Sequence, residues 1–330
     1  MFEYPCNETI DVTPQIVEEQ VMEREAWDIP LSLIAENHLS CMSSQELDDD
    51  WRLNDFFGTI AVINLPASVE RLQKITQELH DIGTYSFTVF KGIDGRRELD
   101  ASIWSKLHHN RENIDTSTIE GQLALDEIHK GEAGCYMSHY TLIRQIKEAF
   151  DAAMIELRSA QASAEPEAIQ NAERKVRQYS RVLILEDDAA FGILKSKTEI
   201  TKKGSGRILR KALKELPMNW DMLYFVARPK GYVRKKSSHL LILRRSISAL
   251  AYAVNHTMYN FLIETLSKIE DPEETEMCPV DNAISAIHYL HEVFLITPSI
   301  AFQQKGKSDI SALYNEHPRQ DNPLGYALQQ

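Results

Sequence analysis

Three consecutive carboxylates, Glu186-Asp187-Asp188, follow the apolar run 181–185. Adjacent carboxylates repel one another, so this sequence favours a nearby cation or a set of hydrogen-bond donors. In an extended chain, residues i and i+2 face the same side, so Glu186 and Asp188 are predicted to converge while Asp187 points away. Two convergent oxygen ligands suit Mg²⁺ or Mn²⁺, which keep positions open for phosphate oxygens. An acidic turn after a strand is the alternative.

A second group of reactive residues is Gly134-Cys135-x-x-Ser138-His139. The stretch 131–134 is predicted to end one segment, so that a helix begins at Cys135 and runs to about residue 158. Free N–H groups at such a helix start would suit a diphosphate. Cys135 and His139 are four residues apart and could share a helix face, but two residues do not make a metal site. A structural role for Cys135 and either a pocket or a structural role for His139 are expected.

Two further aspartates have both a chemical and a structural interpretation. Asp281 begins a helix predicted for 281–288, where a carboxylate can act as a general base or cap the helix. Asp94 lies in the turn sequence 92–95, and turn formation is the simpler role there.

The run Lys305-Gly306-Lys307-Ser308 is similar to the end of a phosphate-binding P-loop. That motif requires a glycine at position 301, which is occupied by Ala301. A P-loop is therefore excluded.

Short apolar runs and helical segments predict the elements that must position these residues. A strand at 58–65, a helix at 68–79 and a strand at 86–91 have the rhythm of a parallel sheet. In such sheets ligands bind outside the carboxyl ends of the strands, which is where the acidic triplet stands. We therefore predict an α/β fold with a mostly parallel sheet flanked by helices. The remaining predicted elements are strands at 181–185, 220–226, 240–243, 249–254 and 292–296 and helices at 205–215 and 257–269.

Two segments are predicted to lie outside this core. Residues 1–55 hold fourteen acidic and two basic side chains and form an acidic appendage with one helix near 13–27, leaving 56–330 as the main domain. A helical insertion is expected at about 143–180, where Pro166 breaks a charged stretch and starts the second helix of a hairpin.

Charge is unevenly distributed along the chain. The net charge is −13, yet residues 195–245 hold fifteen Lys and Arg against three acidic residues. This basic segment is either a solvated face or a surface that attracts a phosphorylated ligand, an acidic partner or a membrane. Nucleic-acid binding is disfavoured, because the whole chain is acidic and no aromatic-interleaved recognition motif accompanies the basic residues.

The predicted setting is a reducing compartment. Cys6, Cys41, Cys135 and Cys278 are scattered, which disfavours a disulfide framework. We find no uncharged run of about 20 apolar residues and no signal-peptide pattern, so a soluble protein is expected.

Seven short motifs occur in order along the chain. They are Asn64-Leu65 with Arg71, Gly134-Cys135-x-x-Ser138-His139, Leu185-Glu186-Asp187-Asp188, Asp221-x-x-Tyr224, Ala251-Tyr252, Val280-Asp281, and Pro298 with Gln303 to Ile310. This ordered set resembles glycosyltransferase family 25, which includes lipopolysaccharide and collagen galactosyltransferases. The resemblance covers about residues 58–311 and implies a GT-A fold, a UDP-sugar donor, a divalent metal and inversion at the anomeric carbon. The acidic appendage and the helical insertion depart from the family pattern.

The resemblance assigns expected roles to individual residues. The expected general base is Asp281, and the expected metal ligands are, in order, Asp188, Glu186 and Asp187. The expected donor-binding residues are Asn64, Leu65, Arg71, Asp94, His139, Glu186, Asp187, Gln303 and Ser308. A surface role for Arg71 is equally compatible with its helical position.

The function expected from this resemblance is transfer of a hexose, galactose or glucose, from a UDP-sugar to a saccharide, glycolipid or protein hydroxyl with Mn²⁺ or Mg²⁺ as cofactor. A cytoplasmic bacterial protein is expected, either at the inner face of the membrane, docked through residues 195–245, or delivered into a host cell. The alternatives are an inactive nucleotide-sugar-binding or regulatory protein on the same scaffold and, less favoured, a metal-dependent phosphohydrolase.

Overall fold

A computed structural model describes residues 51–107, 114–194, 200–304, 306–307 and 314–315. Several features noted in the sequence lie outside the described residues, namely the predicted helix near 13–27 and the residues Cys6, Cys41, Lys305 and Ser308. Trp51 and Leu53, in the segment that the sequence assigned to the appendage, are buried in the core. Trp51 is 1% exposed, and its Nε1 donates a hydrogen bond to Ser205 Oγ at 3.0 Å.

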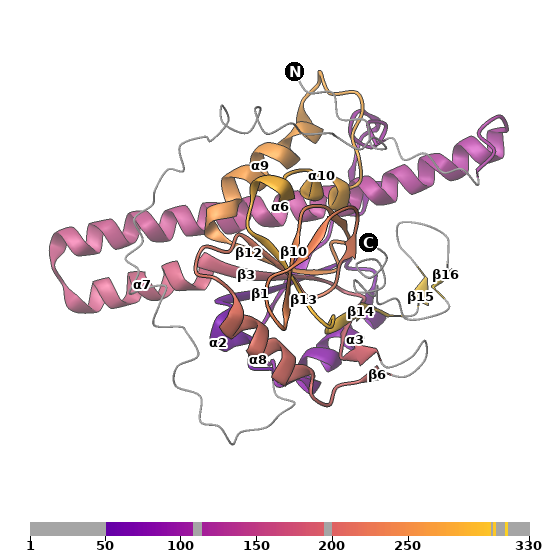
Figure 1. Cartoon of the computed structure of the whole chain (residues 1–330). Coiled ribbons are helices and arrows are strands. Elements are labelled where there is room, and N and C mark those ends of the chain that lie inside the picture. Colours follow the sequence, from indigo (N-terminus) through magenta and orange to yellow (C-terminus); the bar gives the residue numbers. More distant parts are fainter. Residues whose placement is uncertain (1–50, 108–113, 195–199, 305, 308–313, 316–330) are drawn as a thin grey trace, which may run out of the picture.

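An eight-stranded sheet forms the centre of the molecule, in the order β2-β1-β3-β12-β7-β13-β10-β9 (Figure 1). β12 and β10 pair antiparallel with their neighbours, so these two strands run against the other six. The predicted mixed α/β fold with a large, mostly parallel sheet flanked by helices is thereby confirmed. The sheet strands are β1 (Thr59–Asn64), β2 (Thr88–Lys91), β3 (Arg181–Glu186), β7 (Met222–Tyr224), β9 (Val233–Lys235), β10 (Leu240–Leu243), β12 (Ala251–Asn255) and β13 (Val293–Ile296).

Four two-stranded ribbons surround the sheet. One of them, β4 with β14, connects the segment after the acidic triplet to the segment that carries Gln303. The ribbons pair β4 (Ala189–Phe191) with β14 (Ala301–Gln303), β5 (Ile193–Leu194) with β6 (Ile200–Thr201), β8 (Arg228–Pro229) with β11 (Ser246–Ile247), and β15 (Gly306–Lys307) with β16 (Tyr314–Asn315).

Helices cover both faces of the sheet and bury a separate apolar cluster on each (Figure 1). One face packs against α6, α7, α9 and α10, and the other against α2, α3 and α8. The helices are α2 (Leu53–Phe56), α3 (Val69–Asp81), α4 (Gly95–Glu98), α5 (Ala101–Trp104), α6 (Ile119–Ser163), α7 (Pro166–Ser180), α8 (Ser205–Glu215), α9 (Tyr259–Leu266) and α10 (Val280–Ala286), with 3₁₀ turns η2 (His256–Met258), η3 (Ser267–Glu270) and η4 (His288–Leu290).

Helix α6 corrects one prediction. It runs unbroken for 45 residues, so the stretch 131–134 lies in the helix interior and no helix begins at Cys135. The glycines serve close packing instead: a Cβ on Gly134 would lie 2.6 Å from the backbone nitrogen of Gly95 and 2.6 Å from the carbonyl oxygen of Ile93. The predicted diphosphate site at a helix start here is therefore wrong, because interior N–H groups bond within the helix.

The second half of α6 and helix α7 form the predicted helical hairpin. Pro166 occupies the first turn of α7, where its missing N–H costs nothing. Ala164 closes α6 in the left-handed conformation, with φ of 55°. Among the described residues, no helix is long and apolar enough to cross a membrane.

Candidate functional site

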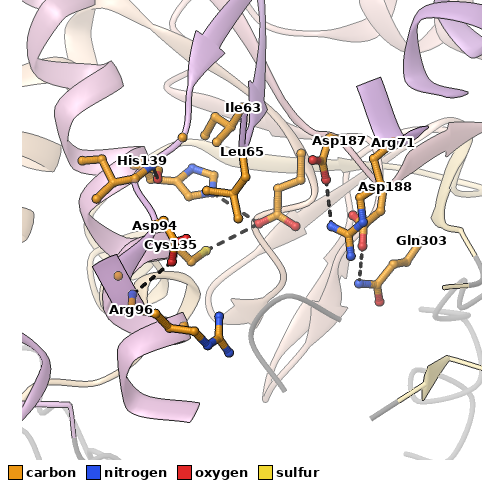
Figure 2. Close-up of a pocket in the computed structure, with 16 residues that line it drawn as sticks. Ile63, Leu65, Arg71, Asp94, Arg96, Cys135, His139, Asp187, Asp188 and Gln303 are labelled. Carbon is orange, nitrogen blue, oxygen red and sulfur yellow. Dashed lines mark hydrogen bonds and ion pairs between the residues drawn. The ribbon is translucent and has the colours of Figure 1, made fainter. Parts of the chain in front are cut away.

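A pocket opens at the carboxyl ends of β1 and β3, between the loop after β2 and the middle of α6 (Figure 2). Its empty space is about 680 Å³, a volume that includes open solvent at the mouth. Most of the predicted site residues line it, as expected for a mostly parallel sheet. These are Leu65, Arg71, Asp94, His139, Glu186, Asp187, Asp188 and Gln303.

Asp187 is held by two residues from the β1 side of the pocket. Its Oδ1 lies 2.9 Å from Arg71 Nη1, and its Oδ2 accepts a hydrogen bond of 2.7 Å from Asn64 Nδ2. Asn64 is 4% exposed and is absent from the pocket lining, so it acts on the pocket through Asp187. The prediction that Asp187 points away is wrong, because β3 ends at Glu186 and strand alternation does not continue into the turn at 187–188.

Asp188 has only part of its hydrogen-bonding capacity satisfied. Gln303 Nε2 donates to its Oδ2 at 2.9 Å, while its Oδ1 is buried and has no hydrogen-bond partner among the described residues. Burial and then the charge of Glu186 raise the pKa of Asp188 to about 7, although Gln303 and Arg71 act in the opposite direction. An oxygen in this state is suited to ligate a cation, which would compensate the charge that the protein leaves uncompensated.

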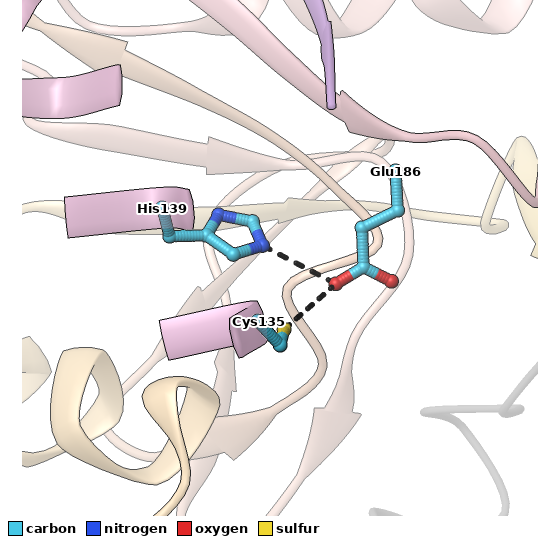
Figure 3. Close-up of side chains that lie close together, drawn as sticks. All are labelled: Cys135, His139 and Glu186. Carbon is cyan, nitrogen blue, oxygen red and sulfur yellow. Dashed lines mark hydrogen bonds and ion pairs between the residues drawn. The ribbon is translucent and has the colours of Figure 1, made fainter. Parts of the chain in front are cut away.

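Glu186 faces helix α6 (Figure 3). Its Oε1 lies 3.3 Å from His139 Nε2 and accepts a contact of 3.8 Å from the Cys135 thiol. The other imidazole nitrogen of His139, Nδ1, is 2.9 Å from the hydroxyl of Tyr252. Cys135 and His139 therefore share a helix face, as predicted, and the fold adds Glu186 as a third potential ligand.

The loop after β2 is fixed against α6 by short contacts. Ile93 N donates to Ser138 Oγ at 2.8 Å, and Asp94 Oδ1 accepts from Arg96 N at 3.1 Å at the start of α4. Asp94 therefore has the predicted turn role, and it also lines the pocket. Arg96 lines the pocket too, and no periodic or motif signal in the sequence singles it out.

Asp281 is located beside the pocket rather than in its lining. It lies in the first turn of α10, whose N-cap is Pro279, so Asp281 does not cap the helix. Its Oδ2 accepts a hydrogen bond of 3.2 Å from Ser248 N. Burial raises the pKa of Asp281, and Glu186 adds to that rise, which indicates that the two carboxylates are close enough to interact.

Comparison with protein families supports part of the predicted resemblance. The model of glycosyltransferase family 25 (LPS biosynthesis protein) matches residues 57–155, which contain β1, α3, β2 and the Cys135–His139 face of α6. No curated protein matches the chain. The resemblance predicted for about 58–311 is thus confirmed over 57–155. Residues 57–155 carry the sequence pattern of glycosyltransferase family 25, so this part of the chain is similar to a family of glycosyltransferases.

Proposed function

We propose that this protein is a GT-A-type, inverting glycosyltransferase that moves a hexose, galactose or glucose, from a UDP-sugar to a saccharide or protein hydroxyl. The observation that carries the proposal is the partly unsatisfied Asp188, next to two further carboxylates, in the pocket formed at the strand ends. A family match over residues 57–155 supports the reaction class.

The residues present fit a divalent cation, Mn²⁺ or Mg²⁺. Asp188 would hold it through the buried Oδ1 that has no partner among the described residues, with Glu186 or Asp187 assisting. Asp187 is the weaker of these two assistants, because both of its oxygens already have protein partners. When bound, such a cation neutralises charge on a diphosphate leaving group.

Donor binding is assigned to the side chains around the carboxylates. Leu65 offers an apolar surface to a base, and Arg71 lies in the lining where a phosphate would need a positive charge. Asp94 stands on the opposite wall, next to Arg96, and is placed to accept hydrogen bonds from hydroxyl groups. Gln303 connects the lining to the segment that leads to Ser308, which lies outside the described residues.

Asp281 is the proposed general base. Transfer with inversion requires a group that accepts the proton of the attacking hydroxyl. Burial raises the pKa of Asp281, and a carboxylate with a raised pKa is a stronger base near neutral pH. In this proposal an acceptor approaches from the α10 side of the pocket, opposite Arg71.

The proposed acceptor is a glycolipid or a protein, and the proposed location is the bacterial cytoplasm or a host cell. Basic side chains on the edge strand β9 and just after it support a peripheral contact with an anionic surface. Arg234, Lys235 and Lys236 are all exposed, and Tyr232 next to them is 64% exposed.

The test is metal-dependent UDP release from a panel of nucleotide sugars, with and without acceptors. Asp188→Ala is expected to lower turnover at least about 100-fold, as for loss of a group that stabilises the leaving charge. Asp100→Ala, an exposed carboxylate outside the pocket, is the matched control and should leave turnover unchanged.

Each alternative function predicts its own result in this assay. Unchanged turnover in Asp188→Ala would contradict the proposed cation role. Binding of UDP with Mn²⁺ but no hydrolysis or transfer from any donor would favour an inactive binding protein. Release of phosphate from simple esters would favour a phosphohydrolase.

A further inference from the structure

Cys135, His139 and Glu186 bring three different ligand atoms together on the α6 side of the pocket (Figure 3). The thiol sulfur, an imidazole nitrogen and a carboxylate oxygen all lie within 4.8 Å of one another. A tetrahedral zinc ion with ordinary bond lengths holds such atoms about 3.3–3.6 Å apart. The separations of Glu186 Oε1 from His139 Nε2, 3.3 Å, and from Cys135 Sγ, 3.8 Å, are close to that spacing.

His139 is oriented as a metal-binding histidine usually is. Its side chain is 1% exposed, and its Nδ1 is 2.9 Å from the Tyr252 hydroxyl. When Nδ1 carries the proton and donates to this hydroxyl, the lone pair of Nε2 points toward Cys135 and Glu186. A fixed partner on the second nitrogen is the arrangement that sets the tautomer and direction of a ligating imidazole.

The charge around the cluster also favours a cation. The Cys135 thiol contacts the carboxylate of Glu186, and Asp187 and Asp188 lie in the same pocket lining. Such a concentration of negative charge in a partly buried place is unfavourable unless a positive charge offsets it. Arg71, a basic residue of the pocket lining, is directed at Asp187.

We propose that Cys135, His139 and Glu186 form a binding site for a thiophilic divalent ion of the Zn²⁺ class. Sulfur and nitrogen ligands select such ions over Mg²⁺ and Mn²⁺, which prefer oxygen. Three protein ligands leave a fourth position, which would be open toward the pocket. The site is separate from the cation proposed at Asp188, because it uses only Oε1 of Glu186, and the second oxygen points away from Cys135 and His139 (Figure 3).

Cobalt provides a direct test, because Co²⁺ replaces Zn²⁺ and gives a thiolate-to-metal charge-transfer band when a cysteine ligates it. The full-length protein is stripped with a chelator and titrated with Co²⁺ and then with Zn²⁺ as competitor. We expect a charge-transfer band at one equivalent that Zn²⁺ removes and Mg²⁺ does not. Cys135→Ser is expected to abolish the band, and Tyr252→Phe to weaken binding about 10–100-fold by releasing the imidazole.

Cys278→Ser is the matched control, since Cys278 forms no disulfide and lies outside the pocket lining, and this variant should keep the band. Glu186→Gln is a second ligand variant if Cys135→Ser does not fold, as judged by circular dichroism before metal is added. Absence of the band in the wild type, or its persistence in Cys135→Ser, would overturn the proposal. The readout is independent of the donor: Asp188→Ala should lose UDP release and keep the cobalt spectrum.

Discussion

Asp221 and Asp188 lie at opposite ends of interior strands of the central sheet, Asp221 just before β7 and Asp188 just after β3. These two strands run in the same direction, because both pair antiparallel with β12. Around Asp221, Thr257 Oγ1 donates to Oδ1 at 2.7 Å, Glu292 N donates to Oδ2 at 3.0 Å, and His291 Nδ1 lies 3.4 Å from Oδ2. Around Asp188, the described residues supply Gln303 for one oxygen and nothing for the other.

The pKa values shift in opposite directions as a result. Burial alone would raise the pKa of Asp221, but His291, Glu292 N–H and Thr257 together hold it below the ordinary value. For Asp188, burial and the charge of Glu186 raise the pKa to about 7. The fold compensates the charge of Asp221 and leaves that of Asp188 partly uncompensated, which is the state expected of the cation ligand proposed above.

The largest expected effect is a loss of stability on substitution of Asp221. Asp221→Asn should lower the free energy of unfolding by about 3 kcal/mol at pH 7, because buried donors lose a charged acceptor. Since the folded pKa of Asp221 lies below its unfolded value, this stabilisation is present above about pH 4 and is lost as the pH falls. Urea denaturation of both proteins from pH 3 to pH 7 would measure the shrinking difference. Wild-type stability of Asp221→Asn at pH 7 would contradict the structural role of Asp221.

Asp188→Asn should have the opposite sign and a smaller size. The folded pKa of Asp188, about 7, lies above its unfolded value, so the cation-free wild type loses stability as the pH rises from about 4 to 7. We expect Asp188→Asn to be more stable than the wild type by about 2 kcal/mol at pH 8 and equal to it at pH 4. Thermal unfolding with and without Mn²⁺ is the measurement, and Mn²⁺ should close the gap. A difference that does not change between pH 4 and pH 8 would contradict this assignment.

Arg71→Met would make Asp187 resemble Asp188 and has the smallest expected effect. The side chain of Arg71 is 22% exposed and Asn64 still bonds Asp187, so a loss of about 1 kcal/mol is expected. Arg174→Met, on the exposed face of α7, is the control and should change stability by less than about 0.5 kcal/mol. Chemical denaturation at pH 7 distinguishes the two, and equal effects would show that the Arg71–Asp187 pair contributes nothing specific.

Local sequence patterns predicted the helices and strands well, because the formation of each depends mainly on residues close together in the sequence. The strand before Glu186 is apolar and buried along its length, and a run of that kind is visible in the sequence. The same holds for α8, whose predicted and observed bounds coincide at 205–215. The position of the site at the strand ends followed from the fold class alone.

What the sequence could not predict depends on contacts between distant segments. The bond from Gln303 to Asp188 joins residues 115 positions apart, and that from Tyr252 to His139 joins residues 113 apart. The prediction of a helix start at Cys135 is wrong because Gly134, just before it, allows the close approach of Gly95 from another segment and does not interrupt the helix. The direction of Asp187 was missed because one residue decides where strand alternation stops.

Because α6 is long and unbroken, it can serve as a distance reference for spectroscopic measurements. At 1.5 Å per residue, its 45 residues span about 68 Å, with Cys135 and His139 near the middle. Leu123 and Ile155 on this helix are 60% and 65% exposed, so spectroscopic labels there would stay at a fixed distance of about 48 Å. A third label on the segment after Gln303 could then be located against both, and any inward movement on adding nucleotide would be read in ångströms.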